Sequence, residues 1–483
     1  MAIASPDPLL KAYDPEAFRN LGHILVDVLA DHLAGVQRRE GPVLPWREPA
    51  AALADWPADF SPAGGADPFA LVQAVLNRSQ HLQHPRYLGH QCAAPLPLAA
   101  LLGMVADLLN NSTAIYEMGP VAMAMERALV QWLAGRVGFL PAVAGGILTH
   151  GGSVGNLTAL LAARQASVPA DVGEEGCQAG PELCLVASDQ ARDAVRHAAQ
   201  IMGLGGRKVI VIPTDAHYRM RVDLLEGALD QAAAQGRQVV AVVASAGSTA
   251  TGAIDPLAAI AGLCEARNLW LHVDAAHSGA MAVSDRLRPA LQGIERAHSV
   301  VIDTHKMLMM PSLATAVLFR NGDHAYQAFS QQAAYLFDQA ARQEWHNLGH
   351  RTLECTKPFL SLNLYVALQV LGTDAFAQFV ERSHDLASRF AARIQSRPGW
   401  ELAVPPEGNI VCFRYRPAGT PDAEVDALQT TLRDTIVQSG TFHLVKTVLR
   451  GATYLRTTLI NPLTTDADLE TLLATVETVA RLR

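Results

Sequence analysis

Short apolar runs alternate with longer helical patterns from about residue 145 onward. The candidate strands are nearly continuous in Val, Ile, Leu and Ala, which is typical of a sheet covered on both faces. They cover residues 183–188, 208–213, 238–246, 269–276, 299–304 and 315–320. This alternation predicts an α/β fold with a mostly parallel sheet and crossover helices.

The segments on either side of this pattern predict two further parts of the molecule. The first eighty or so residues show helical patterns without strands, interrupted by loops rich in Gly and Pro at 41–49 and 61–68. After a helical stretch at 360–371, helices mix with strands such as 409–416. We therefore expect a helical N-terminal arm, a large α/β domain and a small α+β domain, at residues 1–95, 96–371 and 372–483.

The longest apolar stretch, AAPLPLAALLGMVADLLNN at 93–111, contains two prolines and Asp107. Its uninterrupted part is too short to span a bilayer, which takes about 20 apolar residues. We expect a buried helix there. The N-terminus mixes Asp, Lys, Glu and Pro where a signal peptide has an apolar core, so export is not expected.

Composition and charge narrow the classes of partner. The 483 residues are 50% hydrophobic and 17% charged, as in ordinary globular proteins. A net charge of −8 without a basic stripe argues against nucleic acid and anionic membranes as main partners. The six cysteines, at 92, 177, 184, 264, 355 and 412, form no CxxC pair and no metal-like spacing. We expect reduced thiols, no metal and a cytoplasmic location.

Chemically active side chains follow several of the expected strands. Asp274 and His277 end the segment HVDAAH, Ser248 follows the run at 238–246, and Lys306 ends VIDTHK. Ligands of open α/β sheets bind beyond the carboxyl ends of the strands, so these side chains are candidates for one site. A buried ammonium group is costly unless it is paired or neutralised. Lys306, in an otherwise apolar run, therefore needs a partner or a chemical purpose.

Two interpretations remain open for each of three segments. Gly152 and Ser153, in GGILTHGGSVGNLTALLAAR, fit either a phosphate site at a helix start or an ordinary capped turn. Asp274 fits either the partner of the cationic ring nitrogen of a pyridoxal cofactor or a turn cap. Lys306, 32 residues later, fits either a Schiff-base lysine or a lysine that buries only its stem.

Taken together, the motifs resemble those of a known family. Six segments occur in the family order and at similar spacing: HPRYLGHQ, YEMGPVAMAMER, LTHGGSVGNLTALLAAR, SDQA, HVDAAH and DTHKML. From about residue 81 to 365, and again at 454–465, the chain resembles the group II pyridoxal-5′-phosphate-dependent decarboxylases, the family of aromatic amino acid, glutamate and 2,4-diaminobutyrate decarboxylases. The resemblance implies fold type I: a mostly parallel seven-stranded sheet, helices on both faces and a smaller C-terminal α+β domain.

The resemblance also implies roles for single residues. Lys306 is similar to the lysine that holds pyridoxal phosphate covalently, and Asp274 to the carboxylate that keeps the ring nitrogen protonated. Tyr335, in AAYLFD, resembles the tyrosine of a mobile loop that supplies a proton to the substrate carbon after CO₂ leaves. The other residues implied to contact the cofactor are His305, Gly152 and Ser153 near the phosphate, Ala276 under the ring and Ser248 at its polar edge.

Three positions depart from the family pattern. Arg192, in SDQARDAV, stands where a histidine usually stacks on the cofactor ring, and a guanidinium is planar but permanently charged. His277 stands where an aromatic residue is more familiar, and Lys357 where Arg is frequent. We expect both to alter the substrate pocket, although a lone histidine is more often structural. The residues that resemble the substrate side of the family are His90, Gln91, Tyr116 and Glu117.

The function that the resemblance implies is α-decarboxylation of an L-amino acid to an amine and CO₂. An alternative is decarboxylation coupled to oxidative deamination, which gives an aldehyde; Tyr335 argues against it, whereas Arg192 leaves it open. A catalytically silent scaffold would have no need of a buried lysine. The resemblance also implies a homodimer with the active site at the subunit interface and a small amino acid as the ligand, without indicating which amino acid.

Overall fold

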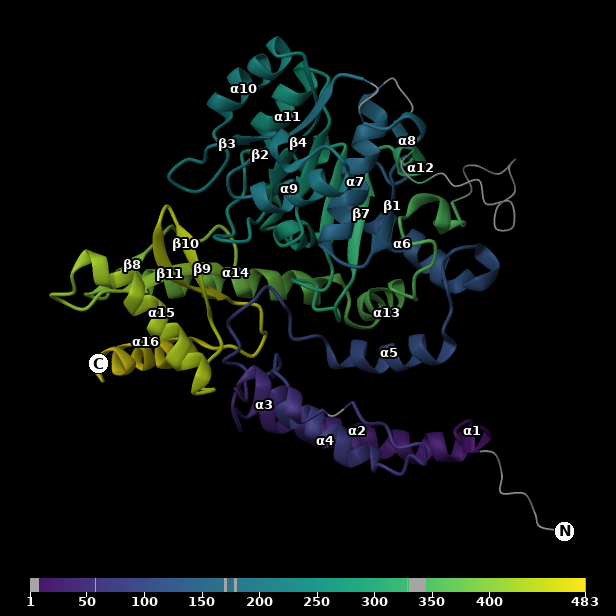
Figure 1. Ribbon diagram of the computed structural model, residues 1–483, viewed down its shortest axis with the longest axis vertical. Helices are drawn as coiled ribbons and strands as arrows, with labels where there is room; N and C mark the ends of the chain where they lie inside the picture. The colour runs from purple at the N-terminus through teal and green to yellow at the C-terminus, as the bar shows by residue number, and fades with distance from the viewer. Residues whose placement is uncertain are drawn as a thin grey trace.

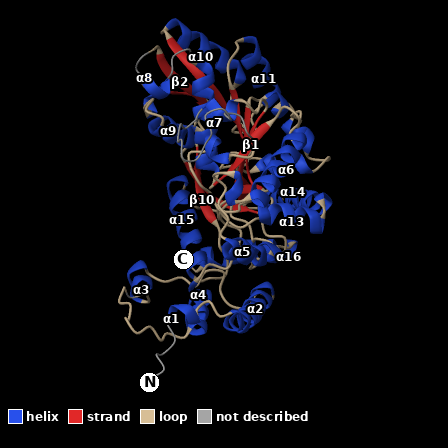
Figure 2. Cartoon of the chain, turned by 90° about the vertical axis from the view of Figure 1, so that its right-hand side faces the viewer, coloured by secondary structure: helices blue, strands red, loops and turns tan. Residues whose placement is uncertain are grey.

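A computed structural model of the chain describes residues 8–56, 58–168, 172–177, 180–327, 329 and 345–482. A seven-stranded sheet lies between helices on both of its faces, in the upper part of the molecule in Figures 1 and 2. In spatial order, its strands are β1 (Gly145–Thr149), β7 (Thr315–Phe319), β6 (Ser299–Asp303), β5 (Leu271–Asp274), β4 (Arg237–Ser245), β2 (Glu182–Ser188) and β3 (Val209–Ile212).

Strand β7 is antiparallel to both of its neighbours, β1 and β6, and the other pairs are parallel. The expected mostly parallel sheet is thus confirmed. The sequence analysis missed β1, because its two glycines resemble the start of the glycine turn that follows. A Cβ added to Gly146 would lie 2.2 Å from the backbone oxygen of Val317. Glycine is therefore what lets β1 approach β7 so closely.

Two hydrophobic cores fill the two faces of the sheet. Along β6, Val300 and Ile302 point into one core and Val301 into the other, as the alternation of a strand requires. The first core is covered by α6 (Pro120–Arg136), α10 (Val222–Ala234), α11 (Leu257–Ala266) and α13 (Ser361–Leu371). The second is covered by α7 (Gly152–Ser167), α9 (Arg192–Ile201) and α12 (His324–Gln327).

The C-terminal part has a sheet of its own. Its antiparallel strands are, in spatial order, β10 (Val445–Leu449), β11 (Ala452–Thr458), β9 (Ile410–Tyr415) and β8 (Trp400–Leu402). The helices α14 (Thr373–Gln395), α15 (Asp422–Gln438) and α16 (Asp466–Arg481) bury apolar faces against it. Phe390 of α14 and Phe413 of β9 meet edge to face in this third core. The expected smaller C-terminal α+β domain is confirmed.

The regular elements of the N-terminal part are helices joined by loops: α1 (Pro8–Lys11), α2 (Pro15–Gln37), α3 (Pro49–Ala54), α4 (Pro68–Arg78) and α5 (Pro97–Leu109). Proline at the first position favours helix initiation in each of them, because its missing N–H would have no partner there. Figure 1 shows α1 to α4 along the lower end of the molecule. This arm is attached to the C-terminal domain by the Arg39 to Asp468 ion pair, 2.8 Å, and by the Val43 N–H to the Gly440 oxygen, 2.8 Å.

The burial expected for the apolar helix at 93–111 is corrected by the structure. The helix forms as α5, but Leu108 is 70% exposed and Leu109 53% exposed, and Ala99 is its one buried residue. Its apolar side chains therefore remain available to another surface. Among the helices that the structure describes, none combines the length and the apolar character needed to cross a bilayer.

Candidate active site

A cavity of about 410 Å³ lies beyond the carboxyl ends of β4, β5 and β6, beside the start of α7. The fold brings the ends of three neighbouring parallel strands together there, which is where ligands of open α/β sheets bind. Eight of the residues predicted from the sequence line this cavity: Gln91, Gly152, Ser153, Ser248, Asp274, Ala276, His277 and Lys306. They come from segments scattered over more than two hundred residues of sequence.

Lys306 follows β6 and is held by a carboxylate. Its Nζ lies 2.8 Å from Oδ2 of Asp303, and the lysine side chain is 17% exposed, at the cavity wall. Thr315 of β7 donates its hydroxyl to Oδ1 of Asp303 at 2.5 Å, which fixes the carboxylate in turn. The ammonium is therefore paired, which explains how an apolar segment can contain it. The sequence analysis did not single out Asp303.

His305 is buried beside this pair and is not part of the cavity wall. Its Nε2 lies 3.8 Å from Oδ2 of Asp303, and its Nδ1 lies 2.8 Å from the backbone oxygen of Ala314. In this arrangement the Nδ1–H donates to the carbonyl, and the ring is anchored next to the segment that carries Lys306. His305 therefore supports that segment from beneath the cavity.

Asp274 ends β5, the strand next to β6, and faces the same cavity. Its Oδ2 accepts a hydrogen bond from Nδ2 of Asn156 at 2.9 Å, and its Oδ1 accepts one from the Ala276 N–H at 3.1 Å. Burial raises the pKa of Asp274, whereas the Lys306 ammonium and these two donors act to lower it. A buried carboxylate and an amine thus occupy neighbouring strand ends, as the sequence analysis predicted.

Helix α7 begins at the cavity with Gly152 and Ser153. The first N–H groups of a helix have no partner within the helix, and its dipole favours an anion at this end. Gly151 has φ 90°, which suits glycine, and a Cβ on Gly152 would lie 3.1 Å from Oδ1 of Asp303. Glycine thus permits the close approach of the helix start to the lysine and its partner. The arrangement is that of an anion site next to an amine.

His277 lines the cavity on the side of Asn409, and the charge of the buried Arg456 acts on it from nearby. His277 donates from Nε2 to Oδ1 of Asn409 at 2.7 Å, while its buried Nδ1 has no hydrogen-bond partner among the described residues. Burial lowers the pKa of His277 to about 3, and the charges of Lys306 and Arg456 add to this effect, so the ring is neutral.

Arg456 of β11 is 7% exposed and was not singled out from the sequence. Its Nη2 lies 3.3 Å from the Thr458 hydroxyl, and its buried Nε has no partner within the described part of the chain. Burial lowers the pKa of Arg456, and the groups that oppose this effect are a thiol and a phenol, Cys412 and Tyr87, rather than a carboxylate. A buried guanidinium without a carboxylate can bind an anionic ligand. The sequence feature that could have identified Arg456 was its position in YLRTTLINPL, a segment that resembles the family pattern.

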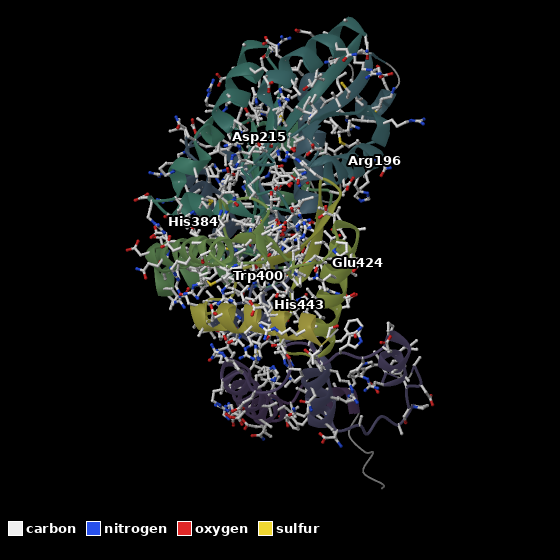
Figure 3. The ribbon with its side chains drawn as sticks, turned by 90° about the vertical axis from the view of Figure 1, so that its left-hand side faces the viewer. Arg196, Asp215, His384, Trp400, Glu424 and His443 are labelled. Carbon is white, nitrogen blue, oxygen red and sulfur yellow. The ribbon has the colours of Figure 1, made fainter. Side chains whose placement is uncertain are left out.

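Four predicted residues lie elsewhere. His90 is exposed beside His443, with 5.6 Å between ring centroids; Figure 3 shows His443 in the C-terminal domain, above the N-terminal arm. Tyr116 and Glu117 are exposed in the short helix η1 (Tyr116–Met118), outside the cavity wall. Lys357 lies in a buried ion pair with Glu126 and does not line the cavity.

Two other predictions fall outside what the structure describes. Tyr335 lies in the segment 330–344, which is not described, and the side chain of Arg192 is not described either. The backbone of Arg192 begins α9, and its neighbours Ala191 and Asp193 line the cavity. Both residues therefore keep their roles as predictions.

A larger hollow of about 570 Å³ lies at the opposite end of the strands. Arg237 and Arg267 line it, but Glu182 binds the first guanidinium at 2.7 Å and Asp230 the second at 2.6 Å. No lysine occurs among the described residues that line it. The smaller cavity at the carboxyl ends is therefore the better candidate for chemistry.

The residues at this cavity fit a phosphorylated pyridine aldehyde. Such a group needs an amine for the aldehyde, a carboxylate for the ring nitrogen and an anion site for the phosphate. Lys306, Asp274 and the start of α7 supply these three. Buried polar atoms without partners among the described residues, Nε2 of Gln91 and Nδ1 of His277, belong to residues of the same wall, as expected where a ligand completes their hydrogen bonds.

Comparison with known proteins gives a consistent result. A family model described as the pyridoxal-dependent decarboxylase conserved domain matches residues 72–416. An L-2,4-diaminobutyrate decarboxylase of Rhizobium meliloti is 33% identical over 408 residues, 83% of this chain and 80% of the relative. An aromatic-L-amino-acid decarboxylase of Bacillus atrophaeus is 29% identical over 475 residues, 96% of each chain. The crystal structure of mouse CSAD superposes with a TM-score of 0.89 at 28% identity, covering 97% of this chain and 99% of the mouse chain.

Proposed function

The chain belongs to the family of pyridoxal-dependent decarboxylases, and on this premise we propose that it removes the α-carboxyl group of an L-amino acid as CO₂ at the cavity of Lys306 and Asp274. One observation carries the proposal: the amine and the carboxylate lie at neighbouring strand ends, beside the start of α7. The reaction is that of a carboxy-lyase, and the expected product is an amine.

Bound pyridoxal phosphate supplies an aldehyde that joins to amines and a ring that withdraws electrons from the carbon losing CO₂. We assign the covalent attachment to Lys306 and the ring nitrogen to Asp274. Gly152 and Ser153 would bind the phosphate through the helix start, with His305 supporting the segment nearby. Ser248 at the polar edge, Ala276 under the ring and Arg192 over it complete the proposed set.

Asp303 prepares Lys306 for its role. Its carboxylate, fixed by Thr315, holds Nζ of Lys306 in one position at the cavity wall. The partner of Lys306 is thus Asp303, which leaves Asp274 free to serve the ring nitrogen. The donors to both oxygens of Asp274 favour its ionised form, against the effect of burial, which raises its pKa. That Asp303 pairs with Lys306 while Asp274 does not supports the assignment of Asp274 to the ring nitrogen.

Two further groups act on the substrate in this proposal. Tyr335 donates the proton that replaces CO₂ on the substrate carbon. Arg456 binds a substrate carboxylate, which is supported by its burial beside His277 and by the unpartnered Nε. Gln91, with an unpartnered Nε2 on the cavity wall, is a second candidate to bind the substrate. The names of the relatives include aromatic, acidic and diamino acid decarboxylases, so the side chain accepted by this protein is left to the assay.

We further propose that the protein is a cytoplasmic homodimer with the active site at the subunit interface. The exposed apolar side chains of α5 and α2, such as Leu108 and Phe18, support this, because monomers rarely expose large contiguous apolar surfaces. Tyr116 and Glu117, exposed in one chain, would then be available to the neighbouring site. All six cysteines are free, which suits a reducing compartment.

The decisive experiment compares the purified protein with Lys306→Ala. We expect the wild-type protein to take up pyridoxal phosphate with the visible absorption of a lysine adduct that borohydride fixes irreversibly, and to release an amine from at least one amino acid in an acidic, basic and aromatic panel. Lys306→Ala should fold but lose the adduct and the activity. The control is Lys446→Ala, which changes an exposed lysine of β10.

The same assay separates the alternative outcome, because aldehyde and peroxide are measured with the amine. Aldehyde with peroxide as the main products would contradict simple decarboxylation. Covalent attachment of the cofactor to Lys306→Ala would contradict the assignment of the lysine.

A further inference from the structure

A continuous chain of hydrogen bonds connects Asp274 to a tryptophan at the other end of β5. Asn156 of α7 contacts Oδ2 of Asp274 at 2.9 Å, and its Oδ1 lies 2.8 Å from Nε2 of His272. Nδ1 of His272 lies 2.8 Å from the Ser299 hydroxyl, which accepts the indole N–H of Trp270 at 3.0 Å. Each of these contacts has the length of a good hydrogen bond. The chain therefore runs through the sheet from the cavity to the opposite end of the strands.

The chemistry of the groups fixes the direction of every bond. A carboxylate only accepts, so the Asn156 amide nitrogen donates to Asp274 and its oxygen must accept from Nε2–H of His272. Nδ1 of His272 is then unprotonated and accepts the hydroxyl proton of Ser299. The indole nitrogen of Trp270 can only donate, which matches the remaining lone pair of that hydroxyl. All four donors thus point toward Asp274.

The imidazole in the middle of the chain carries no charge. His272 is fully buried, and burial lowers its pKa to about 4, so the ring is neutral near pH 7. A neutral ring can donate from one nitrogen while accepting at the other, as this chain requires. A charged ring would donate from both and break the contact to Ser299 or force its hydroxyl to turn.

We propose that Asn156, His272, Ser299 and Trp270 are positioning residues that form a one-way donor chain, which keeps the Asp274 carboxylate ionised and leaves the proton on the ring nitrogen of the cofactor. The inference rests on the proposed function, because it assigns the ring nitrogen to Asp274. Burial opposes the charge of Asp274, as does the nearby carboxylate of Asp303, while Lys306 favours it. A chain of aligned donors polarises each successive bond and favours an anion at its end.

The chain is useful because it stabilises a charge without adding one. A second cation next to Asp274 would compete with the ring nitrogen for the carboxylate. A donor chain withdraws charge from Asp274 through one oxygen only, Oδ2, and Oδ1 accepts from the Ala276 N–H. A simpler interpretation is that these bonds merely satisfy buried polar groups. The two interpretations differ in whether a substitution of Trp270 changes the protonation of the cofactor ring nitrogen.

The test uses Trp270→Phe, which keeps an aromatic ring but removes the first donor. The measurement is the ¹⁵N chemical shift of pyridoxal phosphate labelled at the ring nitrogen, together with the dissociation constant of the cofactor. We expect the shift to move toward the unprotonated form, because Asp274 becomes a stronger base. The dissociation constant should rise roughly threefold to tenfold, the usual range for one lost hydrogen bond.

Substitutions at two further residues test whether the effect on the nitrogen shift passes along the hydrogen-bond chain. Ser299→Ala removes the second donor, which is closer to Asp274, and should move the nitrogen shift further than Trp270→Phe. His272→Gln, whose amide can donate and accept, should retain more of the wild-type shift than His272→Leu. Ser361→Ala is the matched control: it removes a buried hydroxyl that donates to the Ala122 oxygen at 2.9 Å, away from the cavity, and should leave the shift unchanged.

The possible outcomes are distinct. If the wild-type protein binds no pyridoxal phosphate, the proposed function fails. If it binds but the nitrogen shift is the same in wild type, Trp270→Phe and Ser299→Ala, the donor chain is wrong and the function stands. A shift in Ser361→Ala as large as in Ser299→Ala would also overturn the chain, because it would reveal a general effect of buried hydroxyl loss.

Discussion

Two lysines in this chain show how the surroundings of a side chain decide what it does. Lys357 is 1% exposed, and its three donors have Oε1 and Oε2 of Glu126 and the Leu148 oxygen within 3.2 Å. Lys306 has one close carboxylate, Asp303, and remains 17% exposed at a cavity. The first amine is fully engaged and structural, whereas the second has room to react. The expectation that Lys357 alters the substrate pocket finds no support in its position.

Arg456 gives a prediction at the residue scale. Arg456→Gln removes the charge that we assign to a substrate carboxylate, and KM for the preferred amino acid should rise at least about tenfold. The effect on kcat should be smaller, because the group binds the substrate rather than the reacting carbon. Steady-state kinetics measure both constants.

The matched control for this change is Arg416→Gln. Arg416 lies just after β9 and pairs with the exposed Asp422 at 2.7 Å, outside the cavity. It should leave KM close to the wild-type value. An unchanged KM in Arg456→Gln, with the cofactor bound, would remove Arg456 from the site.

Three elements meet at the Glu126 and Lys357 pair. Glu126 belongs to α6, and its Oε1 also accepts the Leu148 N–H of β1 at 2.9 Å. Lys357 lies in the segment that leads into α13 and donates to the Leu148 oxygen at 2.6 Å. The backbone N–H and the backbone oxygen of Leu148 thus both bind to this ion pair. The pair joins the edge strand β1 to helices on one face of the large sheet.

Breaking this pair on one side should be costly. Lys357→Met leaves the Glu126 carboxylate buried without its cation, which typically costs about 3–5 kcal/mol. We expect a clear fall in the denaturant midpoint of unfolding. The double change of Lys357→Met with Glu126→Gln should recover much of the loss, because the amide oxygen still accepts from Leu148 without a charge. Equal midpoints for Lys357→Met and wild type would contradict the role of the pair.

The strands show what the sequence could predict at this scale. Val300, Val301 and Ile302 form an unbroken β-branched run between Ser299 and Asp303, so β6 was predicted with nearly the right ends. In β1, by contrast, Gly145 and Gly146 replaced the apolar side chains by which a strand is recognised. The direction of β7 was not predictable either, because a strand pattern does not record the order or polarity of its neighbours.

At the scale of the whole molecule, the candidate site draws on distant parts of the sequence. Strand ends place Asp274 and Lys306, whereas Asn409, which binds His277, and Arg456, which we propose binds the substrate, come from the C-terminal part. The sequence analysis found the residues that follow strands, because ligands of open α/β sheets bind beyond the carboxyl ends of the strands. It missed Asn156, His272 and Arg456, because a polar residue inside a helix or strand becomes meaningful only when its neighbours across the fold are known.

The exposed side of α5 leads to a prediction about assembly. Changing Val105 and Leu108 of α5 to Glu should place two charges in the proposed interface and separate the subunits. The wild-type protein should then scatter light as about twice 51.6 kDa, and the variant as about 51.6 kDa. Activity should fall with the dimer, because the site is proposed to need both chains.

Leu224→Glu is a suitable control for this experiment. Leu224 is an exposed leucine of α10, at the opposite end of the molecule from the arm in Figure 1. It should leave the mass unchanged. A wild-type protein with the mass of one chain would contradict the dimer directly.

The position of β7 affects when the site is complete during synthesis and refolding. This strand comes last of the seven along the chain but lies between β1 and β6, and its first residue, Thr315, anchors Asp303. Until it inserts, the carboxylate beside Lys306 lacks one of its contacts. The visible absorption of bound pyridoxal phosphate would then report the insertion of β7 into the large sheet. Far-UV circular dichroism reports secondary structure and would not give this information about tertiary assembly.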